Sequence, residues 1–109
     1  MPTWTAATVV VAAADRPDVH GDWSNADEWL PDTMRAAAPE AVCTEAEGRP
    51  TAALVRLGYL AEWSGCHDIA ARIEGMLPAR LPVTYFGSRR RRGRWVKRWR
   101  LYDSMLALR

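Results

Sequence analysis

The sequence predicts a mostly helical α+β fold, and three features indicate it. Residues 3–14 form an alanine-rich run, and apolar side chains recur at helical spacing over residues 51–77. The segments 83–87 and 94–102 are instead rich in aromatic and β-branched residues, which favour strands. With 109 residues, of which 49% are hydrophobic, the chain can bury one modest core. We therefore expect several helices followed by a small C-terminal sheet.

The first expected helix covers residues 3–14. Alanine favours a helix there, whereas the valine block at 9–11 favours a strand. Because the run is longer than ten residues, we expect a helix, with Thr3 or Thr5 as its N-cap. Pro17 ends this element, because the residue before a proline avoids helical ψ angles.

A second helix is expected to begin near Ser24, which forms a capping-box pattern with Asp27 three residues later. Pro31 limits the length of its first turn, unless the helix proper begins there with proline at its first position. Pro39 is expected to end the helix, and residues 43–50 are expected to form an exposed linker. The buried face of this helix would consist of Trp29, Leu30, Met34 and Ala37.

The charge of the chain changes sign at this linker. Residues 1–50 hold nine acidic residues and three arginines, a net charge of −6, whereas residues 51–109 hold four acidic and twelve basic residues, a net charge of +8. The total of +2 hides this asymmetry. We therefore divide the chain into an acidic N-terminal helical extension, residues 1–50, and a basic region, residues 51–109, that suits a polyanionic partner.

The segment 51–77 predicts a pair of helices. Thr51 can cap the first, and Gly58 either costs this helix about 1 kcal/mol relative to alanine or divides it in two. Ser64-Gly65 breaks the pattern, and a further helix over 67–77 resumes it. The apolar side of that helix carries Ile69, Ile73, Met76 and Leu77.

The densest basic stretch is residues 85–103, where seven arginines and one lysine alternate with aromatic residues. Its Gly- and Ser-bounded arginine run separates the two strand-like segments, which is typical of a β-hairpin with a long charged tip. A strand over 94–102 would place Trp95, Lys97, Trp99 and Leu101 on one face, and Arg94, Val96, Arg98, Arg100 and Tyr102 on the other. A helix is the alternative, because Trp95, Trp99, Tyr102 and Leu106 are four, three and four residues apart. Ser104 could cap a short closing helix over 105–108.

The order of helix, Ser-Gly turn, helix and basic hairpin over 51–103 resembles a winged helix-turn-helix DNA-binding domain. The sequence GYLAEWSGC at 58–66 is similar to the pattern of leucine-alanine-glutamate followed by serine-glycine at the second helix and turn of many such domains. The resemblance implies that the 67–77 helix enters a DNA major groove, while residues 89–94 form a wing on the backbone or minor groove. Base edges would then be contacted by His67, Asp68, Ala71 and Arg72.

Arginine suits nucleic acid because its planar guanidinium can bind phosphate or guanine through two hydrogen bonds. Each neutralised phosphate releases counterions, so the affinity grows with the number of arginines that reach the backbone. About five such contacts would give a slope of roughly −4 to −5 in log affinity against log salt. The candidate nucleic-acid-binding residues are Arg89, Arg90, Arg91, Arg92, Arg94, Arg98, Arg100, His67 and Arg72.

Duplex DNA is the expected partner, which would make the chain a small transcriptional regulator or accessory factor of a bacterium, plasmid or phage. A homodimer would add affinity for a short DNA site. One alternative is a protein-protein inhibitor or adaptor whose acidic half, residues 1–50, mimics nucleic acid or docks on a basic partner. A second alternative is RNA binding through the arginine run.

The aromatic residues of the basic stretch have two interpretations. They could stack on unpaired bases, and the rings concerned would be Trp95, Trp99, Tyr85 and Phe86. We expect instead that Trp95 and Trp99 pack against Leu60 and Ile73, because so small a domain needs large rings to hold a hairpin in place.

We expect no enzyme activity, cofactor or metal site. The sequences Cys-His-Asp at 66–68 and His-Gly-Asp at 20–22 place catalytic residue types together, but adjacent residues on a helix point about 100° apart and do not converge. Cys43 and Cys66 match no zinc-binding spacing with the two histidines, so we expect reduced, partly buried thiols.

The longest apolar run, residues 5–14, is too short to cross a bilayer. No positive charge precedes it, as one would in a secretory signal peptide. We therefore expect no membrane partner and a cytoplasmic location.

Overall fold

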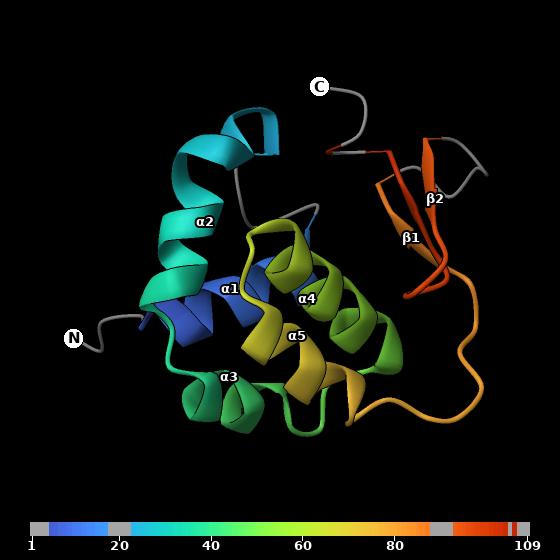
Figure 1. The fold of residues 1–109 in the computed structure, drawn as a ribbon, viewed down its shortest axis with the longest axis horizontal. Coiled ribbons are helices and arrows are strands. Elements are labelled where there is room, and N and C mark those ends of the chain that lie inside the picture. Colours follow the sequence, from blue (N-terminus) through green and yellow to red (C-terminus); the bar gives the residue numbers. More distant parts are fainter. Residues whose placement is uncertain (1–4, 18–22, 88–92, 105, 107–109) are drawn as a thin grey trace.

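The computed structural model of the protein describes residues 5–17, 23–87, 93–104 and 106. Within these residues a group of helices packs beside a small sheet (Figure 1). The elements are α1 (Ala6–Asp15), a 3-10 turn (Trp23–Asn25), α2 (Ala26–Ala36), α3 (Pro39–Ala46), α4 (Thr51–Trp63), α5 (His67–Glu74), β1 (Thr84–Phe86), β2 (Arg94–Val96) and β3 (Leu101–Asp103). The mostly helical α+β class is confirmed.

Helix α4 is the centre of the fold, because α1, α2, α5 and β1 all pack against it. Its residues Val55, Leu57 and Leu60 are almost fully buried. They belong to a single hydrophobic core that also receives Val10 of α1 and Leu30 of α2. Residues of the acidic and the basic regions of the sequence therefore share one core.

The predicted first helix is confirmed, and Thr5 is its N-cap. The Thr5 hydroxyl accepts a hydrogen bond from the backbone N–H of Thr8 at 3.2 Å. This bond satisfies one of the free amides of the first turn. The helix ends at Asp15, two residues before Pro17, as expected.

Helix α2 differs from its prediction at both ends. Its N-cap residue is Asn25 rather than Ser24, because the 3-10 turn before it occupies the position of the expected cap. Pro31 lies inside the helix, where it cannot donate a hydrogen bond to the carbonyl of residue 27 and its ring crowds that carbonyl. Leu30 and Met34 are both fully buried, and their packing holds the turn around the proline in place. Of the predicted buried face, Leu30, Met34 and Ala37 are thus confirmed as buried, whereas Trp29 is half-buried against the core.

The expected linker over residues 43–50 is wrong. Pro39 begins helix α3, where proline fits the first turn, and α3 continues to Ala46. Val42 and Ala46 lie four residues apart and are fully buried, so this segment contributes a helical face to the core. Only the few residues between α3 and α4 form a loop.

Gly58 lies inside an unbroken α4, so the alternative of two helices is wrong. A Cβ atom at this position would collide with the indole ring of Trp99, which is fully buried. The glycine therefore allows the C-terminal segment to approach the helix closely.

The sheet does not contain the predicted hairpin between 83–87 and 94–102. Its strand order is β1-β3-β2, with β1 parallel to β3 and β2 antiparallel to β3. The segment 94–102 is two strands joined by a turn at Lys97–Arg100, so neither one continuous strand nor a helix is correct. In that turn the N–H of Arg100 donates to the Lys97 carbonyl at 3.3 Å, and Arg100 has a positive φ of 49°. The reversal carries Trp99 into the core.

The tight hairpin is therefore β2–turn–β3, residues 94–103, which we call the basic hairpin. The arginine run at 89–92 connects β1 to β2 and lies outside the described residues, as do His20 and most of the closing helix expected over 105–108. In the described part of the chain, no helix combines the length and the apolar character needed to cross a membrane.

Candidate nucleic-acid interface

The basic hairpin carries four exposed cationic residues: Arg94, Lys97, Arg98 and Arg100. Arg94 stands opposite the buried Asp103 in the β2–β3 pairing, and Lys97 and Arg100 lie at the two ends of the turn. Among the described residues, none of these three side chains forms an ion pair with a carboxylate. The hairpin thus presents positive charge that the described part of the chain does not neutralise.

Arg98 is different, because two carboxylates bind it. Its Nε and Nη2 atoms donate to Glu74 at 3.0 and 3.1 Å, and its Nη1 atom donates to Glu62. These hydrogen bonds raise the pKa of the Arg98 guanidinium, and the same bond from Arg98 lowers the pKa of Glu74. Arg98 therefore fastens the hairpin to α4 and α5, and a phosphate would have to displace two carboxylates to reach it.

The rest of the hairpin is anchored by buried contacts. Trp99 lies on Gly58, and its indole N–H donates to the Glu62 carboxylate at 3.2 Å. The Tyr59 hydroxyl donates to Asp103, whose other carboxylate oxygen accepts from the backbone N–H of Leu106 at 2.8 Å. Burial is the largest cause that raises the pKa of Tyr59, followed by its hydrogen bond to Asp103. The exposed cations consequently stand on a fixed support.

The candidates on α5 occupy a different electrostatic setting. His67 and Arg72 are both exposed, but Arg72 lies 3.5 Å from the Glu40 carboxylate of α3. Asp68 is also exposed on the first turn of α5. Of the predicted residues that the structure describes, Arg72 and Arg98 lie next to carboxylates, whereas no ion pair involves Arg94, Arg100 or His67 within the described ranges.

Sequence reasoning misplaced some of the aromatic residues. Phe86 and Trp99 are fully buried, so they belong to the core and cannot stack on a base. Trp95 is 42% exposed, so the prediction that it packs in the core is wrong. Tyr102 was not predicted as a functional ring, yet it lies between Tyr85 and Trp95 on one face of the sheet. The strand order β1-β3-β2 produces this arrangement, and no local sequence pattern encodes that order.

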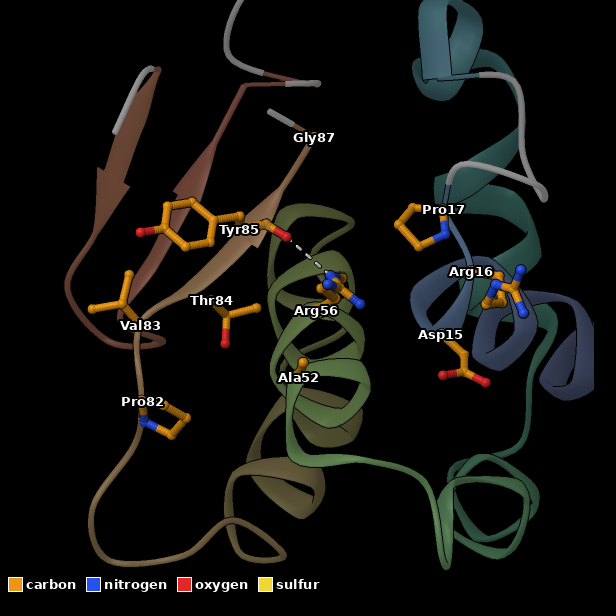
Figure 2. A pocket seen from close by; sticks show the side chains of 10 residues that line it. All are labelled: Asp15, Arg16, Pro17, Ala52, Arg56, Pro82, Val83, Thr84, Tyr85 and Gly87. Atoms are coloured by element: carbon orange, nitrogen blue, oxygen red, sulfur yellow. Dashed lines mark hydrogen bonds between the residues drawn. The ribbon is translucent and has the colours of Figure 1, made fainter. Parts of the chain in front are cut away.

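A groove of about 770 Å³ lies between the end of α1, the start of α4 and β1. Figure 2 shows Arg56 at its centre, with the Tyr85 ring directed away from it. The Arg56 Nε atom donates to the Tyr85 carbonyl at 3.1 Å, and its Nη1 atom lies 3.4 Å from the Ala14 carbonyl. At the same edge, Arg49 pairs with Asp15 at 2.7 Å. Arg56 therefore ties β1 to the end of α1.

Cys43 and Cys66 are both free thiols and half-buried. Burial raises the pKa of the Cys66 thiol, which favours its neutral form. Within the described ranges, no three histidine, cysteine or acidic side chains are grouped closely enough to hold a metal ion.

Comparison with known proteins gives two matches. The family model described as the AbiEi antitoxin C-terminal domain matches residues 1–63, which end with α4 and do not include the basic hairpin. Among solved structures, the crystal structure of the RV2827C protein from Mycobacterium tuberculosis is similar, with a TM-score of 0.81 and 26% sequence identity. That similarity covers 97% of this chain and 37% of the other, so this chain spans little more than a third of the length of its structural relative. No curated protein matches the chain.

Proposed function

Because the chain belongs to the AbiEi antitoxin C-terminal domain family, we propose that it acts in a toxin–antitoxin system as a DNA-binding regulatory domain. The family match is to residues 1–63, and the similarity to the solved structure extends over the hairpin as well. Duplex DNA is the proposed partner, because the exposed cations of the basic hairpin suit a line of phosphates.

The observation that carries this proposal is the exposure of Arg94, Lys97 and Arg100 on a hairpin that is firmly anchored to the helices. Because the backbone that carries these groups is already ordered, phosphate binding has to order only the side chains. The chain continues from β1 into four consecutive arginines at 89–92 before it enters β2. We propose that these arginines add further phosphate contacts next to the hairpin.

The finer proposal is that α4, the Ser64-Gly65 turn and α5 act as a helix-turn-helix. His67 and Arg72 would then approach the DNA from α5. Electrostatics favour the hairpin as the main contact, because Arg72 already lies near Glu40 and Asp68 repels phosphate. We therefore assign α5 a secondary role.

A direct test is the binding of a fluorescently labelled DNA duplex at low salt. Replacing Arg94, Lys97 and Arg100 together by alanine should weaken binding more than tenfold, because three phosphate contacts are lost. The control is Arg35→Ala on α2, which removes one exposed positive charge away from the sheet and should leave the affinity nearly unchanged. Equal affinity of the triple variant and the wild type would refute the proposal.

Exposed acidic residues on the N-terminal helices favour a second function for a member of an antitoxin family. An antitoxin can act by binding its toxin, and the acidic residues Asp27, Glu28 and Glu40 are exposed on α2 and α3. We propose these helices as a surface for a basic protein partner. Replacing Asp27 and Glu28 by their amides should weaken binding of the full chain to its toxin, measured by calorimetry, and leave DNA binding intact; Glu40 is kept in this variant because it lies beside Arg72. Unchanged affinity for the toxin would remove this surface from consideration.

A further inference from the structure

Three aromatic rings form a row across the sheet. In the strand pairing, Tyr85 of β1 is opposite Tyr102 of β3, and Trp95 of β2 is opposite the same tyrosine. The rings of Tyr85 and Tyr102 are nearly parallel, at 14°, with centroids 6.0 Å apart. The rings of Trp95 and Tyr102 are tilted by 47°, with centroids 4.7 Å apart. All three rings are therefore in contact distance of a neighbour in the row.

The row lies on the face of the sheet that is turned away from the helices. Side chains alternate along a strand, and the neighbours Phe86, Leu101 and Asp103 are fully buried on the helical side. Phe86 packs there against the rings of Trp23 and Tyr59. The described helices all lie on that side of the sheet (Figure 1). None of the helices that the structure describes therefore covers the outer face.

Trp95 is the exposed end of the row. This residue is 42% exposed, and among the described residues it is the one large hydrophobic residue that is exposed. Contact with Tyr102 on one side fixes the orientation of the indole and leaves another side open to solvent. Cross-strand aromatic pairs stabilise sheets, but this role alone does not require that the largest ring remain exposed.

The charges around the row are positive. Lys97 and Arg100 are exposed in the turn that joins the two strands carrying Trp95 and Tyr102. The nearest acidic groups of the hairpin and its support are already engaged: Asp103 is buried beneath the sheet, and Glu62 and Glu74 bind Arg98. An aromatic surface bordered by cations complements a chain that carries both flat bases and phosphates.

We propose that the outer face of this sheet binds single-stranded nucleic acid, with an unpaired base stacked on Trp95 and the adjacent phosphates on Lys97 and Arg100. Tyr102 and Tyr85 act as positioning residues that hold the indole. This inference rests on the proposed function in one respect, that the basic hairpin binds nucleic acid. A duplex can use the same cations, but its bases are stacked inside the helix and do not reach Trp95.

The test compares three labelled probes: a 12-nucleotide single-stranded DNA, the RNA of the same sequence, and the corresponding DNA duplex. Trp95→Ala should weaken single-strand binding about tenfold, because base–aromatic stacking is lost. Trp95→Phe retains a ring and should weaken it less than threefold. Both variants should bind the duplex within twofold of the wild type. Quenching of tryptophan emission by the single strand should also be smaller in Trp95→Phe than in the wild type.

The outcomes separate this inference from the proposed function. The stacking proposal is overturned if the protein binds the duplex but no single strand, or if Trp95→Ala leaves single-strand binding unchanged. Either result leaves the DNA-binding proposal standing. Single-strand binding without duplex binding supports the stacking proposal and contradicts the other. Weakening of all probes together with a lower melting temperature of Trp95→Ala shows a structural role only, and overturns the inference. Binding of either the DNA or the RNA strand supports it, and their ratio identifies the natural strand.

Discussion

The guanidinium of Arg98 binds the carboxylate of Glu74 through two hydrogen bonds, Nε to Oε2 at 3.0 Å and Nη2 to Oε1 at 3.1 Å. This pairing joins the turn of the basic hairpin to the end of α5, and Glu62 of α4 binds the same guanidinium. Arg98 thus has a structural role, although it lies in a stretch that otherwise suits nucleic acid. In this role it differs from Arg94 and Arg100.

Removal of this pairing should loosen the hairpin. Arg98→Ala is expected to lower the free energy of unfolding by about 1 kcal/mol, because a partly exposed ion-pair network contributes little more than that. The control Arg35→Ala breaks an exposed pair with Asp32 and should cost less than about 0.5 kcal/mol. Urea denaturation measures both values. Equal effects of the two substitutions would contradict the supporting role of Arg98.

The same pairing predicts a dependence on pH. Arg98 holds the pKa of Glu74 below its usual value in the folded state, so its stabilisation is present above the unfolded-state pKa of about 4.3 and is lost as the pH falls through the folded-state pKa. The stability difference between the wild type and Glu74→Gln should therefore be full at pH 7 and shrink below pH 4. Chemical denaturation at several pH values tests this, and a difference that stays constant down to pH 2 would contradict it.

Gly58 should not tolerate a side chain. Gly58→Ala gains about 1 kcal/mol of helix propensity but forces a methyl group into the buried indole of Trp99, so we expect a net loss of at least about 1 kcal/mol. Gly75→Ala is the matched control, since its Cβ would meet only backbone oxygens, at 3.4 and 3.7 Å. Thermal unfolding compares the two, and a Gly58→Ala variant as stable as the wild type would show that the close contact is wrong.

The buried hydrogen bond from Tyr59 to Asp103 should be a stabilising element. Tyr59→Phe removes the donor beneath the sheet and is expected to cost about 1–3 kcal/mol. Because the pKa of Tyr59 is raised, its contribution is fully present below the ordinary tyrosine pKa of about 10 and is lost as the pH rises through the folded-state pKa. Tyr102→Phe on the outer face is the control. A loss that does not exceed that of the control would contradict this role of Tyr59.

Local sequence signals predicted α1, α2, α4 and α5, but they missed α3 and predicted the sheet poorly. Thr5 as N-cap, the Ser64-Gly65 break and the buried faces of α2 and α5 follow from caps and apolar spacing, which act within a few residues. The turn at Lys97–Arg100 was not predicted, because the alternating pattern of residues 94–102 favours one continuous strand. The turn is stabilised by burial of Trp99 against Gly58, which is distant in the sequence. Strand order is likewise set by contacts between segments far apart in the chain.

The candidate site was predictable in composition but not in detail. A count of arginines identifies the basic stretch, yet it does not distinguish Arg98, which two glutamates bind, from Arg94 and Arg100. The partners Glu62 and Glu74 lie 36 and 24 residues away in the sequence. The aromatic row also required the parallel pairing of β1 with β3, which no periodicity reveals.

The most direct test of the central claim, that the exposed cations of the basic hairpin bind phosphate, is the slope of log affinity for duplex DNA against log salt. Each phosphate contact contributes about 0.9 to this slope, so replacing Arg94, Lys97 and Arg100 by alanine should make it shallower by about 2.7 than in the wild type. A triple variant with the slope of the wild type would show that these cations do not touch the DNA.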